Sequence, residues 1–216
     1  MLTVLVDYDS GNLHSAEKSF QRMSADVGGG DVIVSSKPED VVRADRIVLP
    51  GDGAFPACRN ALTRDRAALF EAIVASVIVK GRPFMGICVG MQMMASWGRE
   101  YEDTKGFDWI EGEIAKITPA DPSLKVPHMG WNDLVLDGSN PKHPVLDGIN
   151  TGDHAYFVHS YSFRVTDPAH RLAHVDYGGD ITAVVGRDNM IGMQFHPEKS
   201  QQTGLRMIAN FLNWKP

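Results

Sequence analysis

A cysteine placed between two glycines, where an expected strand meets an expected helix, constrains the fold of this chain more than any other feature. The segment is Gly86-Ile87-Cys88-Val89-Gly90-Met91-Gln92, and the apolar residues 83–87 predict a strand. Glycines on both sides of a sharp turn relieve the crowding that the turn creates. In open α/β folds such a turn lies at the carboxyl edge of the sheet, where ligands bind. We therefore expect a nucleophile elbow that presents Cys88 at that edge.

The rest of the chain fits an α/β fold. In the first half, expected strands alternate with expected helices, which is typical of a parallel sheet flanked by helices. Later segments are shorter and more β-like, which predicts an antiparallel addition. The sequence thus predicts one domain over residues 1–216 with a mostly parallel central sheet. Strands are expected at residues 2–6, 31–35, 46–49, 83–87, 155–161, 172–175, 182–185 and 191–195, and helices at residues 15–23, from the break at residues 50–53 to about residue 81, and at residues 204–212.

The long helix that follows residue 53 has a regular apolar pattern. Five of its residues keep the i, i+3, i+4, i+7, i+8 spacing of a core-facing stripe, and we expect all five to face the core. They are Phe70, Ile73, Val74, Val77 and Ile78.

Composition excludes several classes of protein. The net charge is −6 and no cluster of five or more basic residues occurs, which argues against a nucleic-acid partner. Two cysteines, Cys58 and Cys88, do not make a disulfide framework in 216 residues. The N-terminal segment lacks the basic region and cleavage site of a signal peptide, and no apolar run has the length needed to cross a bilayer. We expect a soluble, cytoplasmic protein without membrane contact.

Cys88 has two interpretations. At a helix N-terminus the backbone N–H groups and the helix dipole favour a thiolate. The same N–H groups, starting at Val89, are placed to receive a developing oxyanion. Gln92 lies four residues later on the same helix face, where its amide would hold a polar substrate over the sulfur. The alternative is a buried cysteine that only packs.

His196-Pro197-Glu198 supplies the groups that a reactive cysteine needs. In an extended segment residues i and i+2 point the same way, so Glu198 can bind one imidazole nitrogen while the other faces the thiol. This predicts a Cys–His–Glu triad. A surface turn is the alternative for this motif considered alone.

The loop Pro50-Gly51-Asp52-Gly53 also follows an expected strand, so it should lie at the same sheet edge. One of its N–H groups would complete the oxyanion hole, although a plain turn would have the same composition. The other histidines are scattered and have no recognised metal-ligand spacing. Cys58 is expected to be structural. We expect no metal and no cofactor.

With these motifs in place, the sequence resembles the class I (triad-type) glutamine amidotransferases over nearly its whole length. The elbow and the Phe195-His196-Pro197-Glu198 run carry that resemblance. Further runs resemble the glutaminase subunits of imidazole glycerol phosphate synthases, which act in histidine biosynthesis. These runs are residues 7–13 (Asp-Tyr-Asp-Ser-Gly-Asn-Leu), 50–55 (Pro-Gly-Asp-Gly-Ala-Phe), 127–132 (Pro-His-Met-Gly-Trp-Asn), 156–161 (Tyr-Phe-Val-His-Ser-Tyr) and 196–200 (His-Pro-Glu-Lys-Ser).

The resemblance implies a mechanism. Cys88 would attack the side-chain amide of glutamine with His196 as general base, and Glu198 would orient His196. Water would then hydrolyse the glutamyl thioester to give glutamate and ammonia. By similarity, three residues hold the glutamine and four backbone positions supply the oxyanion donors. The glutamine-binding residues are Gln92, Ser160 and Tyr161, and the oxyanion positions are Val89, Gly51, Asp52 and Gly53.

The resemblance also implies a partner. In this family the ammonia passes to a cyclase subunit built as a (β/α)₈ barrel, with which the glutaminase forms a heterodimer. By similarity, Asn12, Pro127, Met129 and Trp131 are interface candidates. Met129 and Trp131 are open to a second interpretation as internal core residues.

Asp52 departs from the family pattern, which usually has valine there. Aspartate enters positive φ more readily than a β-branched residue. Our hypothesis is that the loop turns into its active orientation at lower cost, which raises partner-free glutaminase activity. The opposing effect is that a carboxylate near Cys88 disfavours the thiolate.

Rival functions remain at this point. One group comprises other enzymes of the fold, namely a cysteine peptidase, a γ-glutamyl hydrolase or the amidotransferase of another pathway. The other is a non-catalytic regulatory role, against which the intact Cys88, His196 and Glu198 argue.

Overall fold

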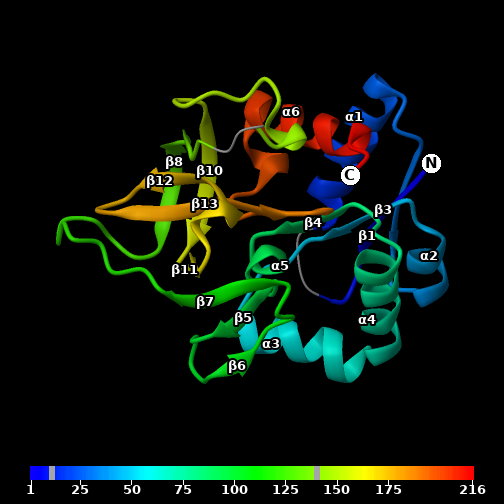
Figure 1. Ribbon diagram of the computed structural model, residues 1–216, viewed down its shortest axis with the longest axis horizontal. Helices are drawn as coiled ribbons and strands as arrows, with labels where there is room; N and C mark the ends of the chain where they lie inside the picture. The colour runs from blue at the N-terminus through cyan, green and yellow to red at the C-terminus, as the bar shows by residue number, and fades with distance from the viewer. Residues whose placement is uncertain (10–12, 139–141) are drawn as a thin grey trace.

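The structure, a computed structural model, describes residues 1–9, 13–138 and 142–216, and its centre is an eight-stranded mixed sheet (Figure 1). The strand order is β2-β1-β3-β4-β14-β13-β12-β9. The first five strands are mutually parallel, and the last three continue the sheet antiparallel. The predicted parallel sheet with an antiparallel addition is therefore confirmed. These strands are β1 (Leu2–Val6), β2 (Asp31–Ser35), β3 (Arg46–Leu49), β4 (Phe84–Ile87), β9 (Val135–Leu136), β12 (Arg171–Asp176), β13 (Asp180–Arg187) and β14 (Met190–Met193).

Helices cover both faces of this sheet. In Figure 1, α1 and α6 lie together on one face, and α3 and α4 lie on the other. Phe20 of α1 meets Phe211 of α6 edge to face, with ring centroids 6.4 Å apart. Among the described residues, no helix is both long and apolar enough to cross a membrane. The helices are α1 (Leu13–Val27), α2 (Pro38–Arg43), α3 (Phe55–Asn60), α4 (Ala67–Val74), α5 (Val89–Gln92) and α6 (Gln201–Asn213), with π-helical segments η1 (Ala61–Asp65) and η2 (Ala75–Val79) and short 3₁₀ turns η3 (Pro144–Leu146), η4 (Pro168–His170) and η5 (Pro197–Lys199).

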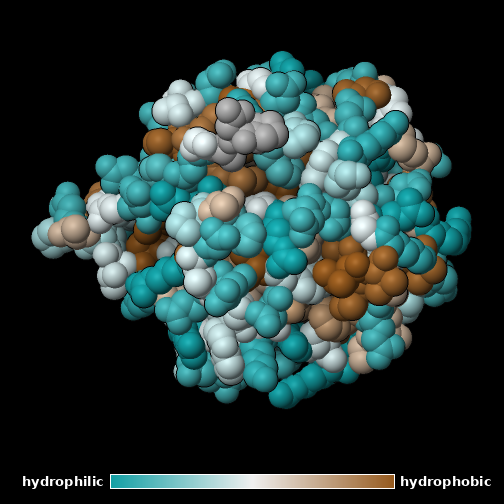
Figure 2. Space-filling model, in the orientation of Figure 1, coloured by the Kyte–Doolittle hydropathy of each residue, from teal (hydrophilic) through white to brown (hydrophobic). Residues whose placement is uncertain are grey.

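The expected single long helix before Gly81 is interrupted, and the stripe prediction is wrong at its end. A π-helical segment, η2, continues from α4, and a π turn has more residues than an α turn, which rotates the faces that follow. Ser76 and Val77 are buried there, whereas Ile78 is 49% exposed. Val79, and Val42 of α2, are exposed as well. Figure 2 shows an apolar surface over α4 and α2.

Two smaller sheets flank the central sheet, and the chain changes sheet at Ser160. One strand is predicted over residues 155–161, but β10 pairs with β8 whereas β11 pairs with β7. Ser160 and Tyr161 consequently lie where the two sheets meet. The four-stranded sheet has the order β11-β7-β5-β6, with β5 (Ala95–Gly98), β6 (Thr104–Lys105), β7 (Ile110–Lys116) and β11 (Tyr161–Val165), and the two-stranded sheet consists of β8 (His128–Asp133) and β10 (His154–His159).

Candidate active site

Cys88 stands on a strained turn between β4 and the single-turn helix α5. Its φ and ψ are 53° and −114°, a conformation that a non-glycine residue adopts only when its surroundings impose it. A Cβ on Gly86 would lie 2.7 Å from the Gly90 carbonyl oxygen, and one on Gly90 would lie 1.8 Å from the Leu49 oxygen. Only glycine fits at either position. The predicted elbow is therefore present, and its glycines allow backbone segments to touch.

His196 and Glu198 lie on the segment that leaves β14, the parallel neighbour of β4. His196 Nδ1 is 2.9 Å from Glu198 Oε1, which leaves Nε2 for the hydrogen bond between His196 and Cys88. Cys88 and His196 are 6% and 8% exposed. Burial alone would lower the pKa of His196, but the hydrogen bonds and charges of Cys88 and Glu198 outweigh it and raise that pKa to about 10. The structure thus brings the three expected triad residues together, with an imidazolium beside the sulfur.

The 50–53 loop packs directly on the elbow. A Cβ on Gly51 would lie 3.0 Å from the Gly90 nitrogen and 2.5 Å from the Tyr8 hydroxyl, so the chain approaches α5 closely here. The positive φ of the loop, +102°, is at Gly53 and not at the exposed Asp52. Cys58 is buried, and its Sγ lies 3.2 Å from the Asp52 carbonyl oxygen.

A cavity of about 350 Å³ opens in front of Cys88. It joins the elbow, the 50–53 loop and the junction between β10 and β11, so it brings together the predicted oxyanion and glutamine-binding residues. Gly51 is buried and does not line the cavity. The lining residues are Asp52, Gly53, Cys88, Val89, Gln92, Glu100, Pro127, Val158, His159, Ser160, Tyr161 and His196.

Three of the four candidate interface residues are among the described residues, and all three lie on the outside of the molecule. Met129 and Trp131 alternate along the outer face of β8 and are 61% and 49% exposed, so the core interpretation is wrong for both. Pro127 is exposed and borders the cavity. Asn12 lies outside the described residues.

Two polar residues of the site were missed by the sequence interpretation. Gln194 is fully buried; its Nε2 lies 3.8 Å from Cys88 Sγ, and its Oε1 accepts a 3.0 Å bond from Gln92. Its position two residues before His196 was a usable signal, because residues i and i+2 of an extended segment point the same way. Glu100 places a carboxylate at the cavity and caps α3 through the Phe55 N–H at 2.7 Å. Nothing in the local pattern indicated it.

Residues 4–214 match the family described as glutamine amidotransferase class-I. The chain therefore belongs to the class I glutamine amidotransferase family. Proteins named imidazole glycerol phosphate synthase subunit HisH from Cereibacter sphaeroides and Ruegeria pomeroyi are 70% and 63% identical to it, each over the full length of both chains. The HisH of Rhodospirillum rubrum is 52% identical, also over the full length of both.

Solved structures show that the amidotransferase fold extends over the whole chain. A putative GMP synthase protein from Thermoplasma acidophilum has a TM-score of 0.70 at 16% identity, covering 99% of this chain and 92% of that one. PurLQS from Thermotoga maritima has a TM-score of 0.67 at 16% identity, covering 98% and 97%. At such identities the likeness concerns the fold alone.

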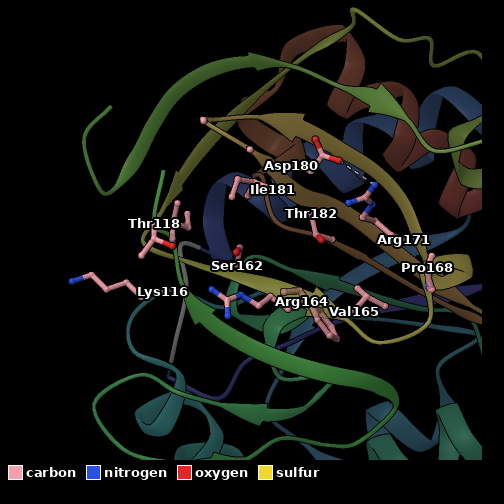
Figure 3. Close-up of a pocket in the computed structure, with 14 residues that line it drawn as sticks. Lys116, Thr118, Ser162, Arg164, Val165, Pro168, Arg171, Asp180, Ile181 and Thr182 are labelled. Atoms are coloured by element: carbon pink, nitrogen blue, oxygen red, sulfur yellow. Dashed lines mark hydrogen bonds and ion pairs between the residues drawn. The ribbon is translucent and has the colours of Figure 1, made fainter. Parts of the chain in front are cut away.

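A second, larger cavity of this amidotransferase, about 420 Å³, lies between β11 and β13, and neither a cysteine nor a histidine lines it (Figure 3). Its basic groups are largely paired: Arg171 binds Asp137 at 2.9 and 3.0 Å and approaches Asp180 at 3.5 Å. In the described part of the chain, no group of three or more histidine, cysteine, aspartate or glutamate side chains has the geometry of a metal site.

Proposed function

We propose that this chain is the glutaminase subunit of an imidazole glycerol phosphate synthase and that residues 1–216 form one glutamine amidotransferase domain. The observation that carries the proposal is the cavity in which Cys88, paired with His196 and Glu198, faces Gln92 and the 160–161 segment. The full-length identity to curated HisH subunits supports the pathway. Such an enzyme acts in the cytoplasm.

In the first half-reaction, Cys88 Sγ attacks the side-chain amide carbon of glutamine. His196 accepts the thiol proton as general base, and its pKa, raised to about 10, favours holding that proton while the sulfur forms the new C–S bond. Negative charge develops on the amide oxygen and is received by the N–H of Val89 and by an N–H of the Gly51-Asp52-Gly53 segment. His196 then protonates the leaving nitrogen, the C–N bond breaks, and ammonia leaves a glutamyl thioester.

In the second half-reaction, neutral His196 removes a proton from water, which attacks the thioester carbon. The C–S bond breaks, glutamate is released, and His196 returns its proton to the Cys88 sulfur. Glu198 holds the imidazole through both steps by its bond to Nδ1, at 2.9 Å.

Glutamine binds in the cavity through its polar groups. Ser160, Tyr161 and Gln92 line the wall next to the sulfur, and the Glu100 carboxylate provides a negative charge for the α-ammonium group. A cavity of about 350 Å³ suits one free amino acid.

Ammonia then passes to a cyclase subunit of (β/α)₈-barrel form. Transfer within a complex is needed because ammonia in bulk water would be protonated and lose its nucleophilic lone pair. Pro127, Met129 and Trp131 present exposed apolar surface beside the cavity, and aromatic and methionine residues are enriched at such interfaces. We include Asn12 in this interface by similarity.

The test is a glutaminase assay of the purified chain, alone and with the cyclase subunit of the same organism and its nucleotide ligand. We expect hydrolysis in the complex and its loss, by at least about 1,000-fold, in Cys88→Ala. Cys58→Ala is the matched control, because that cysteine is also buried but its sulfur bonds the Asp52 carbonyl oxygen rather than His196, and it should retain turnover. A complex that binds glutamine without hydrolysing it would show a regulatory subunit instead, and peptide cleavage would show a peptidase.

A further inference from the structure

Two buried histidines face each other next to the glutamine cavity. His128 and His159 are directly opposite in the β8–β10 ladder, and they are 2% and 6% exposed. His128 Nδ1 lies 3.0 Å from His159 Nε2, and His159 Nδ1 lies 2.9 Å from the Tyr161 carbonyl oxygen. His159 and Tyr161 both line the cavity. The triad mechanism uses neither histidine.

The hydrogen-bond partners determine which nitrogen carries each proton. A backbone carbonyl only accepts, so His159 Nδ1 donates to Tyr161. In a neutral imidazole Nε2 is then an acceptor, so the bond between the rings is donated by His128 Nδ1. His128 Nε2 is left to accept from the Asn132 amide nitrogen at 3.3 Å. Both rings are therefore Nδ1–H tautomers.

A second proton on either ring is disfavoured. Burial lowers the pKa of His159 to about 3 and that of His128 to about 4. The Asn132 amide cannot turn to accept a proton from His128, because its oxygen accepts from the Asp133 N–H at 2.8 Å and its nitrogen donates to the Asp176 carbonyl at 3.0 Å. The histidine pair thus has one arrangement at neutral pH.

This arrangement extends to the cysteine through side-chain amides. The Tyr161 carbonyl also accepts from Gln92 Nε2, at 3.2 Å. The other hydrogen of Gln92 Nε2 goes to Gln194 Oε1 at 3.0 Å, and Gln194 Nε2 faces Cys88 Sγ at 3.8 Å. Both hydrogens of the Gln92 amide are used, so its Oε1 is the atom that remains for a ligand.

We infer that His128 and His159 are positioning residues that hold the Tyr161 carbonyl, and through it the Gln92 amide, in the orientation that receives glutamine. The inference rests on the proposed function. Without the His159 bond, the 161 carbonyl is free to turn and the Gln92 amide loses a fixed acceptor. The Gln92 amide is then able to rotate, so that its NH₂ group faces the cavity in place of its oxygen. Glutamine binding would weaken, whereas bond breaking at Cys88 would continue.

Two substitutions at His128 separate this role from simple core packing. The His128 ring stacks on Phe157, with centroids 4.8 Å apart, and packs at a tilt against Tyr177, with centroids 4.1 Å apart. His128→Phe keeps these ring contacts but removes the donor to His159. His128→Asn removes the ring contacts but places an amide N–H close to the position of Nδ1. The two variants should therefore change stability and glutamine binding in opposite ways.

The experiment measures steady-state kinetics of the two-subunit complex, thermal unfolding of the same proteins, and the Kd for glutamine on a Cys88→Ala background. For His128→Phe we expect KM and Kd to rise about tenfold, the effect of one buried hydrogen bond, with kcat within twofold of wild type. His128→Asn should have the lower melting temperature but a KM within threefold of wild type. In ¹⁵N NMR spectra both wild-type histidines should be neutral Nδ1–H tautomers.

The inference is overturned if His128→Phe hydrolyses glutamine with unchanged KM, if KM follows melting temperature across the two variants, or if either ring is an Nε2–H tautomer. These results require a wild-type complex that hydrolyses glutamine. Absence of hydrolysis by the wild-type complex would overturn the proposed function and this inference with it. Hydrolysis with an unaffected KM would overturn this inference alone.

Discussion

The elbow region and the β8–β10 sheet hold their functional groups by different means. Cys88 and His196 lie just after the ends of two adjacent parallel strands. Close backbone packing at Gly86 and Gly90 fixes the conformation of the elbow. Tyr161 instead lies where the chain leaves a two-stranded sheet, and side-chain hydrogen bonds fix its carbonyl. Two strands alone form a marginal sheet, so this region depends on its side chains. Changes at the elbow should therefore lower kcat, and changes at β8–β10 should raise KM.

The largest expected effect on activity is that of Glu198→Gln, which tests the elbow region. The amide keeps the shape of the side chain but removes the charge that holds the His196 imidazolium at 2.9 Å. We expect kcat to fall about 100-fold with little change in KM, as is typical for loss of an acid–base orienter. Lys199→Gln, an exposed neighbour, is the matched control and should leave kcat unchanged. A rise in KM without loss of kcat would contradict the assignment of Glu198 to the triad.

The same variant has a second readout in the pH dependence of stability. The pKa of folded His196 is raised to about 10, above the ordinary value of 6.5. A raised pKa stabilises the fold fully below pH 6.5, and this contribution is lost as pH rises through 10. Melting temperatures from pH 6 to 10 should therefore fall less in Glu198→Gln, because part of the raising interaction is already removed. An identical slope in both proteins would contradict the ion pair.

Gln194 lies between the two regions, and we expect Gln194→Leu to have an intermediate effect on activity. The change removes the amide donor near Cys88 and the acceptor of Gln92 while keeping a buried side chain of similar length. Because Gln194 contacts both Cys88 and Gln92, we expect its replacement to lower kcat and to raise KM. The loss of these hydrogen bonds should lower kcat/KM about tenfold. Gln194→Glu is the comparison variant: it keeps the acceptor for Gln92, so it should lower kcat more than it raises KM. If both variants raised KM and left kcat unchanged, Gln194 would have no role in the reaction at the Cys88 sulfur.

The two regions also differ in how far the sequence predicted them. The elbow and the His196–Glu198 pair are local, since spacing within a few residues determines which side chains meet. The His128–His159 pair is not local: these residues appeared scattered in the sequence, and only the β8–β10 register makes them neighbours. The strand break at Ser160 was missed for the same reason, because pairing with β8 on one side and β7 on the other overrides a continuous apolar run. The exposure of Ile78 depends on a π turn, which the apolar spacing does not reveal.

The smallest effect is expected at Asp52, which belongs to the elbow region but is exposed. Gly53 already carries the positive φ of the loop, so the described conformation needs none at Asp52. If the loop turns during catalysis, aspartate adopts positive φ more easily than valine, and Asp52→Val should lower partner-free turnover about threefold. Asp52→Asn is the control for charge, because asparagine also tolerates positive φ but cannot repel the thiolate. If Asp52→Asn had a higher turnover than wild type, repulsion between the Asp52 carboxylate and the Cys88 thiolate would limit the reaction. If Asp52→Val had the wild-type turnover, the ease of positive φ at residue 52 would not affect partner-free activity. Because this contribution acts before the partner binds, the three proteins should converge once the cyclase is present.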